Sequence, residues 1–285
     1  MVSIFKSFAA ALVFYTSLPI PLPWNLDVRY VARLAPLIGL VIGGLLTFED
    51  WILRDLTMPL LTRTTVLVAS GLALTGGLHM DGVMDTADGL AVMDPKRRLD
   101  VMADSNTGAF GAMTAVVLLG LKVMALADLA GTNVLTGDNT LGANVVDANV
   151  SGSALWPVLL TVPMWGRWGQ QVAIVAYPYL KPTGKGAFHK DALDSAGVII
   201  SGLVCCLITI GCWALIYGSP LAWGGQWWAG QWWAIIGIRL LMAVGAAIAT
   251  GAWFNAKLGG HTGDTYGAVV EWTEAITLTL FTLLA

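Results

Sequence analysis

The amino-acid sequence predicts an all-α protein, a polytopic bundle of transmembrane helices with seven or eight membrane segments. Of its 285 residues, 56% are hydrophobic and 12% are charged, against the roughly 25% charged residues usual in soluble domains. The mean hydropathy is +0.73. The 13 Trp and 33 Gly residues are typical of membrane proteins, which have aromatic interface belts and glycine-tolerant helices. These values exclude a mainly soluble protein.

Eight apolar stretches come close to or exceed the about 20 residues that a helical span needs. They cover residues 4–20, 34–48, 65–79, 109–128, 154–178, 197–218, 232–254 and 268–285. The first ends in a proline-rich run, residues 19–24, that cannot continue a helix and suits a turn at the membrane interface. Because no A-x-A-like cleavage site precedes these prolines, we expect a retained span rather than a signal peptide. We therefore expect a single integral membrane domain over residues 1–285.

The charges in the connections predict which of them share a side of the membrane. Lysine or arginine occurs in the connections at 80–108, 179–196 and 255–267. Neither occurs at 129–153 or 219–231. Basic residues mark cytoplasmic loops, so the first three connections should face the cytoplasm. The stretch 49–64 must then be external despite Arg54 and Arg63, and the orientation of the N-terminus stays open.

Net charge and cysteine content exclude further classes of function. A net charge of −3 gives no basic footprint, so we expect no nucleic-acid partner, with lipid as the surrounding phase. The three cysteines lie in one apolar run, residues 205–212, without the spacing of a metal site or a disulfide framework. The sequence leaves the oligomeric state open, a homo-oligomer included.

Three aspartates follow one another at helical spacing near the end of the third apolar stretch. In a helix, Asp81, Asp85 and Asp88 lie at i, i+4 and i+7 and point the same way. Carboxylates on one stripe repel one another unless a cation compensates them. Hard oxygen ligands at this density suit Mg²⁺ or Mn²⁺, which take carboxylates together with substrate phosphates. We predict a metal site here; the alternative is a solvated acidic turn at a helix end.

The next segment adds a second acidic pair and a polar turn. Asp100 and Asp104 are four residues apart, and residues 105–108 (SNTG) lead into the next span. The N-terminus of that span is suited to meet an anion. The basic run at residues 96–98 either contacts phosphate or anchors the loop at the cytoplasmic surface.

Further charged residues occur within or at the start of later spans. Asp264, Glu271 and Glu274 enter the final span at helical spacing. Such carboxylates are costly in a membrane unless they face a polar cavity, a cation or cationic side chains. Lys122 and Arg167 interrupt two other spans, and each needs a carboxylate or an anionic substrate as partner. Because the acidic segments fall on the side predicted from the basic loops, we expect one shared site.

Three motifs of the chain resemble the cobalamin synthase (adenosylcobinamide-GDP ribazoletransferase) family. They are residues 76–89 (GGLHMDGVMDTADG), 104–111 (DSNTGAFG) and 259–274 (GGHTGDTYGAVVEWTE). The resemblance covers essentially the whole chain. It implies a Mg²⁺-dependent enzyme of the bacterial inner membrane, with its active site facing the cytoplasm. Such enzymes join adenosylcobinamide-GDP to α-ribazole or α-ribazole 5′-phosphate and release GMP.

The resemblance suggests roles for the charged residues. We expect Asp81, Asp85, Asp88 and Asp104 to be metal ligands, with Asp104 or Asp85 as the catalytic residue that handles the proton of the acceptor hydroxyl. The expected substrate-binding residues are Lys122, Arg167, Asp264, Glu271 and Glu274.

Two other functions remain as alternatives. A CDP-alcohol phosphotransferase motif also begins Asp-Gly, as at Asp81, but Asp85-Thr86 stands where that motif has Ala-Arg. A cation-coupled transporter also places carboxylates in the membrane. Its acidic residues would be expected at mid-membrane depth and within paired repeats, neither of which the sequence indicates.

Overall fold

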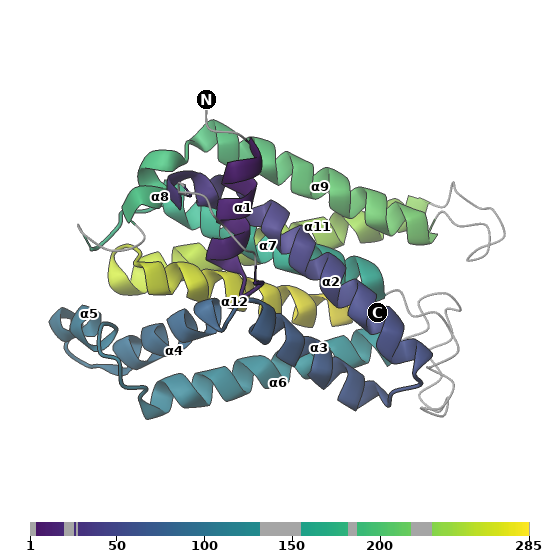
Figure 1. Cartoon of the computed structure of the whole chain (residues 1–285), viewed down its shortest axis with the longest axis horizontal. Coiled ribbons are helices and arrows are strands. Elements are labelled where there is room, and N and C mark those ends of the chain that lie inside the picture. Colours follow the sequence, from purple (N-terminus) through teal and green to yellow (C-terminus); the bar gives the residue numbers. More distant parts are fainter. Residues whose placement is uncertain are drawn as a thin grey trace.

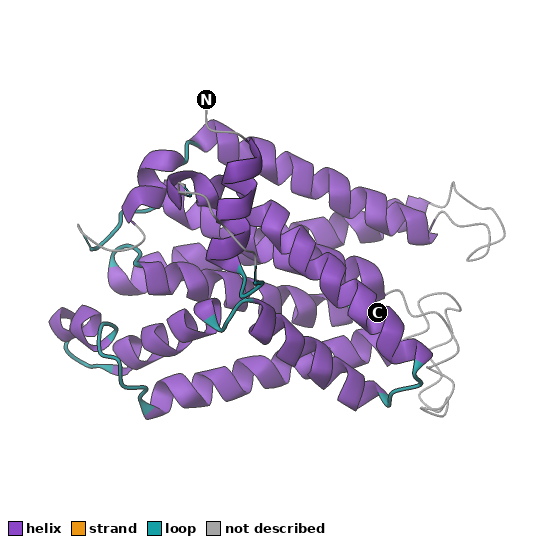
Figure 2. Ribbon diagram, viewed as in Figure 1, coloured by secondary structure: helices purple, strands orange, loops and turns teal. Residues whose placement is uncertain are grey.

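Long apolar helices make up most of the chain in the computed structural model, which describes residues 4–19, 26, 28–131, 155–181, 187–217 and 230–284 (Figures 1 and 2). The longer helices are α1 (Ile4–Tyr15), α2 (Ala35–Asp55), α3 (Leu60–Leu74), α4 (Leu78–Ala91), α6 (Ala109–Gly131), α7 (Leu155–Ala176), α9 (Ser195–Tyr217), α11 (Gly230–Leu258) and α12 (Gly263–Thr282). Short helical segments are η1 (Val28–Leu34), η2 (Pro95–Arg97), α5 (Arg98–Val101) and α8 (Ala187–Ala192). Over these ranges the all-α prediction is confirmed.

Each of the eight predicted apolar stretches falls on a helix, but fewer of these helices qualify as membrane spans. Within the described ranges, four are long and apolar enough to cross a membrane: Tyr30–Asp55, Ala109–Gly131, Ser195–Ile216 and Trp232–Leu258. The bent pair α3–α4 would make a fifth. The predicted number of seven or eight spans is therefore supported only in part. α1 is short, with 12 residues, and α7 and α12 contain polar residues that an isolated span would not tolerate.

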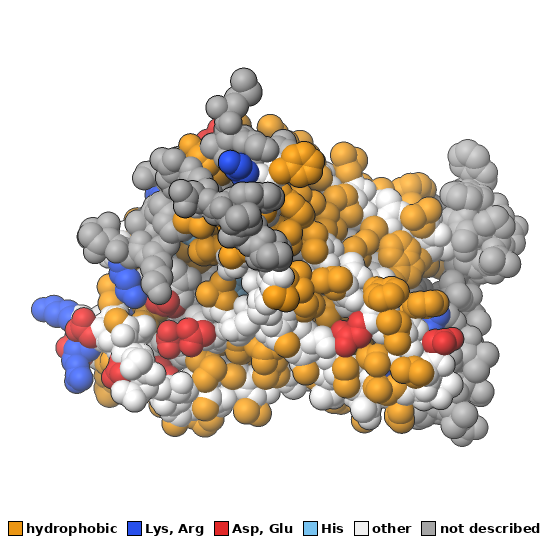
Figure 3. Space-filling view, viewed as in Figure 1, with side chains coloured by type: hydrophobic (Ala, Val, Ile, Leu, Met, Phe, Trp, Pro, Cys, Tyr) orange, Lys and Arg blue, Asp and Glu red, His pale blue; other side chains and the backbone are white. Residues whose placement is uncertain are grey.

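Helix α7 tolerates its polar residues because it is buried by its neighbours. Most of its side chains are inaccessible, including Arg167, Gln170 and Gln171. It packs against α2, α9, α11 and α12. The outward faces of the bundle instead present large apolar side chains, which cover much of the visible surface in Figure 3. Polar residues buried among other helices, together with apolar outward faces, are typical of a protein surrounded by lipid.

The three connections predicted to share one side of the membrane lie at the same end of the bundle. Helix α5, helix α8 and the turn between α11 and α12 are all at the left-hand end of Figure 1, opposite the α2–α3 turn. A hydrogen bond from Arg98 Nη1 to the Lys257 carbonyl, 3.0 Å long, joins two of these connections directly. Most of the two uncharged connections, and residues 20–24 of the proline-rich run, lie outside the described residues.

A sharp bend between α3 and α4 sets the direction of the acidic helix. The two helices meet at 90°. Gly76 and Gly77 have φ angles of +60° and +73°, a left-handed conformation that glycine adopts without steric cost. α4 can therefore leave the direction of α3 and run along both α6 and α12. Its observed range confirms that Asp81, Asp85 and Asp88 lie on one helix.

Two glycines allow α2 to contact the backbone of α7. A Cβ atom at Gly39 would lie 2.5 Å from the Pro163 carbonyl oxygen, and one at Gly43 would lie 2.5 Å from that of Leu159. Small residues at such positions let membrane helices approach closely and gain packing contacts. At Gly44 the nearest atom to a Cβ would be 4.0 Å away.

We predict that Gly43→Ala lowers the free energy of unfolding by about 1–3 kcal/mol, because the added methyl group would force the two backbones apart. Thermal unfolding of the purified protein in detergent measures the effect. Gly44→Ala is the matched control and should unfold with the wild type. Equal stability of the two variants would show that α2 and α7 are not in backbone contact.

Candidate active site

Carboxylates from two helices create a strongly negative region at the end of the bundle that carries the basic connections. Asp85 of α4 is half-buried, and Asp81, Asp88 and Asp264 each repel a negative charge on it. Lys181 provides a nearby positive charge. Figure 3 shows acidic side chains gathered on this part of the visible face, with basic side chains beyond them. The structure thus brings the first and third acidic motifs together, as the sequence predicted.

Close packing of α4 against α12 brings these carboxylates together. A Cβ atom at Gly82 would lie 2.4 Å from the backbone oxygen of Asp264, and one at Gly267 would lie 3.1 Å from the backbone of His79. Larger residues at either glycine would separate the two helices. The spacing of glycines in both motifs therefore has a structural cause.

The start of α12 is held by a capping box. The Thr262 hydroxyl accepts a hydrogen bond from the Thr265 N–H, and the Thr265 hydroxyl accepts one from the Thr262 N–H. Thr262 also donates a hydrogen bond to Asp264 Oδ2 over 3.1 Å. Lys181 Nζ lies 3.3 Å from the same oxygen, and both side chains are partly exposed. Asp264 is thereby fixed in place while it remains accessible.

His261 is a structural residue in this arrangement. Its Nδ1 lies 3.1 Å from the Thr265 hydroxyl and its Nε2 lies 3.1 Å from the Gly251 carbonyl. Burial lowers its pKa to about 4, so the ring is neutral at physiological pH. Its backbone bonds to Pro178 and Leu180 and so ties the segment before Lys181 to the start of α12.

Asp88 caps helix α6. Its Oδ2 accepts a hydrogen bond from the Gly108 N–H at 2.7 Å, and its Oδ1 accepts one from the Gly111 N–H at 2.8 Å. Unsatisfied N–H groups and the helix dipole make a helix N-terminus a favourable place for a carboxylate. A Cβ atom at Gly108 would come within 2.3 Å of this carboxylate and one at Gly111 within 2.5 Å. The predicted metal role of Asp88 remains a prediction; capping is its observed role.

Asp104 lies in the turn that precedes α6. It is exposed, and its Oδ1 accepts hydrogen bonds from the backbone N–H and the side-chain amide of Asn106, at 3.0 and 2.8 Å. These bonds form a local turn. The turn leads directly to Gly108, which Asp88 anchors to α4.

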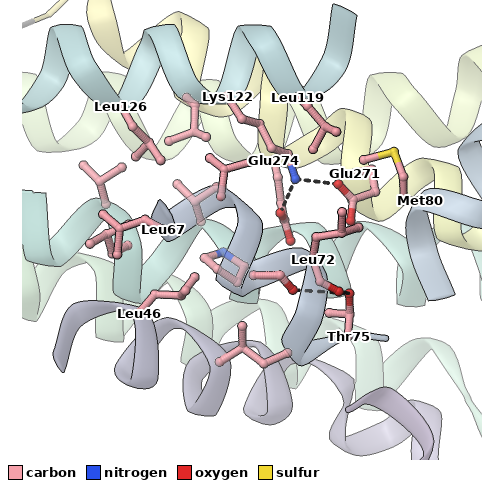
Figure 4. A pocket seen from close by; sticks show the side chains of 18 of the residues that line it. Leu46, Leu67, Leu72, Thr75, Met80, Leu119, Lys122, Leu126, Glu271 and Glu274 are labelled. Carbon is pink, nitrogen blue, oxygen red and sulfur yellow. Dashed lines mark hydrogen bonds and ion pairs between the residues drawn. The ribbon is translucent and has the colours of Figure 1, made fainter. Parts of the chain in front are cut away.

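A network of four charges lies deeper in the bundle, beside a cavity of about 70 Å³ (Figure 4). Lys122 Nζ is 2.6 Å from Glu271 Oε2 and 2.7 Å from Glu274 Oε2. Arg167 Nη1 is 2.8 Å from Glu274 Oε1 and donates to the Pro163 carbonyl over 2.9 Å. Two cations and two anions therefore compensate one another.

This network bears on several predicted substrate contacts. The sequence left open whether Lys122 and Arg167 pair with a carboxylate or with an anionic substrate, and the structure gives carboxylate partners to both. Glu271 and Glu274 likewise have cationic partners in α6 and α7, which explains how the last helix tolerates them. Their predicted role in substrate binding is untested. Of the expected substrate-binding residues, Asp264 is the one that lies with the α4 carboxylates.

The carboxylate oxygens of α4 and the start of α12 suit a hard divalent cation, although they do not surround a complete metal site. Among the residues that the structure describes, no three acidic, His or Cys side chains are gathered closely enough to hold a metal ion. Mg²⁺ commonly binds through one or two carboxylates, with water and substrate phosphates as its remaining ligands. Asp81, Asp85 and Asp264 provide such carboxylates.

Comparison with known proteins identifies relatives over nearly the full length. The sequence model of a family described as "Cobalamin-5-phosphate synthase" matches residues 7–282. A protein of Trichormus variabilis is 48% identical over 275 residues, which cover 96% of both chains. One from Synechococcus elongatus is 42% identical over 96% of this chain and 95% of its own. Both are named adenosylcobinamide-GDP ribazoletransferase. No solved structure matches the chain.

We predict that Asp88→Asn weakens the start of α6 by about 1–2 kcal/mol, because an amide has a single acceptor oxygen for the two N–H groups that the carboxylate serves. Hydrogen–deuterium exchange should become faster at the amides of residues 108–111. Asp94→Asn is the control, since Asp94 accepts one backbone bond, from Lys96, which an amide oxygen can replace. Unchanged exchange at residues 108–111 would contradict the capping role.

We predict that Lys122→Met lowers the free energy of unfolding by about 3–5 kcal/mol, because Glu271 then loses its cationic partner in a buried setting while Glu274 keeps only Arg167. The double variant Lys122→Met/Glu271→Gln should recover part of this loss. Thermal unfolding in detergent measures both, with Asp128→Asn on the exposed face of the same helix as control. A double variant that is no more stable than Lys122→Met would argue against charge compensation.

Proposed function

The chain belongs to the cobalamin-5-phosphate synthase family, and we propose that it is an adenosylcobinamide-GDP ribazoletransferase that completes the assembly of a cobalamin. Its relatives carry this name, and the match extends over nearly the whole chain. The observation that carries the proposal is the meeting of α4 and α12, which gathers Asp81, Asp85 and Asp264 beside Lys181.

The proposed reaction is a phosphoryl-group transfer between two substrates. The 3′-hydroxyl oxygen of α-ribazole, or of its 5′-phosphate, forms a bond to the phosphorus that links adenosylcobinamide to GMP. The bond from that phosphorus to the bridging oxygen breaks, GMP leaves with the electron pair, and the hydroxyl proton passes to a base. Positioning and charge neutralisation supply most of the acceleration in such transfers.

We assign Asp81, Asp85 and Asp264 to Mg²⁺ binding. The ion would neutralise the charge that develops on the transferred phosphate and on the leaving GMP. Lys181, next to Asp264, is suited to contact phosphate oxygens at the exposed edge of the site. Asp88 supports the site indirectly, since its hydrogen bonds hold the start of α6 against α4.

We assign proton acceptance to Asp104. Its exposed carboxylate lies on the loop that Gly108 fixes next to α4, so it can meet an acceptor hydroxyl that enters from solvent. Asp85, the other catalytic candidate, is surrounded by like charges that a cation would compensate. Metal binding is therefore the better use of Asp85.

We place the enzyme in the bacterial inner membrane with the acidic region facing the cytoplasm. The basic residues of the same end, including those of α5 and Lys257, support this orientation. Both expected substrates carry phosphate or ribose groups that a water-filled site can admit. The deeper charge network holds α6, α7 and α12 together below this site.

We predict that the purified full-length protein in proteoliposomes releases GMP when given adenosylcobinamide-GDP, α-ribazole and Mg²⁺. Chromatographic identification of the nucleotide is the measurement. EDTA should stop the release and added Mg²⁺ should restore it. Asp81→Ala should lower the rate by about 100-fold or more, since even outer-shell partners of metal ligands contribute about 10- to 100-fold.

Asp55→Asn, an exposed change at the opposite end of the bundle, is the control and should retain wild-type turnover. Release of CMP from a CDP-activated alcohol would instead identify a CDP-alcohol phosphotransferase. Substrate flux without chemical conversion would identify a transporter. Full GMP release by Asp81→Ala would refute the assignment of the site while leaving the reaction intact.

A further inference from the structure

Lys181 is the basic side chain that the structure places against the carboxylates of the proposed active site. Its Nζ lies 3.3 Å from Asp264 Oδ2. Its positive charge also acts on Asp85, together with the negative charges of Asp81, Asp88 and Asp264. One ammonium group cannot compensate several carboxylates. The site therefore keeps a negative charge that attracts a divalent cation while Lys181 occupies one of its oxygens.

The backbone that carries Lys181 is fixed to the segment before α12. The His261 N–H donates a hydrogen bond to the Pro178 carbonyl, and the Leu180 N–H donates one to the His261 carbonyl, each over 2.8 Å. These bonds form a parallel bridge between Tyr179 and His261. The main chain next to Lys181 is thus held at the start of α12 and does not depend on the ion pair with Asp264.

Aromatic contacts hold the same segment through its side chains. The Tyr177 ring lies 5.4 Å from the His261 ring, and the Tyr179 ring stacks on Tyr266 at 5.9 Å. In extended backbone, alternate side chains point to the same side, so Lys181 follows the two tyrosines toward α12. Its ammonium group ends a flexible stem of four carbons. The side chain of Lys181 can therefore change partner while its backbone stays in place.

The ion pair of Lys181 is looser than the pairs deeper in the bundle. Lys122 and Arg167 lie between 2.6 and 2.8 Å from their carboxylate partners, and none of these side chains is more than 12% exposed. The side chains of Lys181 and Asp264 are 30% and 28% exposed. An exposed pair contributes little to stability, whereas a buried pair is costly to break. Lys181 is therefore a cation that can be released, unlike Lys122.

We propose that Lys181 is the counter-ion of Asp264 until a divalent cation binds, and that its ammonium group then moves to a phosphate oxygen of the nucleotide substrate. This inference rests on the proposed function and describes how the same site is regulated. The ammonium group and the cation need the same carboxylate, so they exclude one another at Asp264. The Thr262 hydroxyl, which donates to Asp264 Oδ2 over 3.1 Å, keeps the carboxylate oriented when Lys181 leaves.

The exchange couples the binding of metal to the binding of nucleotide. Metal binding frees Lys181 for the phosphate, and a phosphate that holds Lys181 frees Asp264 for the metal. Such coupling is reciprocal, since each ligand changes the affinity of the other by the same factor. Loss of Lys181 should therefore strengthen metal binding in the absence of nucleotide and weaken nucleotide binding. A lysine that only contacts phosphate, or only supports the fold, would not oppose metal binding.

The test is titration of the purified full-length protein in nanodiscs with Mn²⁺, detected by electron paramagnetic resonance. Mn²⁺ takes the same hard oxygen ligands as Mg²⁺. Without nucleotide, Lys181→Met should bind Mn²⁺ about two- to fivefold more tightly than the wild type, the value of one exposed ion pair. With metal present and α-ribazole absent, the same variant should bind adenosylcobinamide-GDP about three- to tenfold more weakly.

Lys257→Met is the matched control. It removes the same charge from an exposed position at the same end of the bundle, where the ammonium group lies over the Trp253 ring rather than beside a carboxylate. Both of its affinities should equal those of the wild type. Lys181→Arg keeps the positive charge, so its Mn²⁺ affinity should return to the wild-type value.

Unchanged or weaker Mn²⁺ binding by Lys181→Met would overturn the proposal, even if the enzyme releases GMP. Equal tightening in Lys257→Met would also overturn it, because the effect would then follow from net charge alone. Tighter Mn²⁺ binding and weaker nucleotide binding in Lys181→Met would support the exchange. If that result were found in a protein that releases no GMP, it would support the exchange and refute the proposed reaction.

Discussion

The compensation of charge between Lys122, Arg167, Glu271 and Glu274 is the constraint on which the bundle depends. Each of these groups would be very costly alone in a low-dielectric interior, so each requires its partners at hydrogen-bond distance. Because the partners come from α6, α7 and α12, the network fixes the position of α12 along its two neighbours. The start of α12 then lies where Asp264 can face α4. The charge network, in which two cations compensate two carboxylates, therefore determines where the acidic site lies.

Glycine determines the rest of the geometry around the site. At Gly82 the absence of a side chain allows α4 to contact the backbone of α12, and at Gly108 it allows Asp88 to reach the start of α6. The three acidic motifs therefore carry their glycines for contact between helices as much as for ligand access. Carboxylates that repel one another are kept together by the close packing of the helices that carry them.

Much of the fold, and part of the site, could be predicted from the sequence. Apolar length located eight of the longer helices but not α4, and the basic loops predicted which ends lie together, because both depend on composition alone. The number of spans was predicted less well. Helices α7 and α12 carry polar residues at positions that other helices bury, so they do not have the composition of a membrane span. Sequence spacing correctly placed Asp88 on the same helix as Asp81. Spacing alone does not show which other segment contacts the Asp88 side chain. The capping of α6 depends on contacts between segments that are distant in sequence.

The charge network also constrains how the protein is made. Lys122 and Arg167 are synthesised before Glu271 and Glu274, so two helices that each carry a basic residue enter the membrane before the carboxylate partners of these residues exist. Until α12 arrives, these cations must be held by water, by lipid phosphate or by the insertion machinery. A chain that lacks the last helix retains unpaired positive charge within its apolar body. The synthesis of α12 and the neutralisation of Lys122 and Arg167 are therefore linked in the biogenesis of this protein.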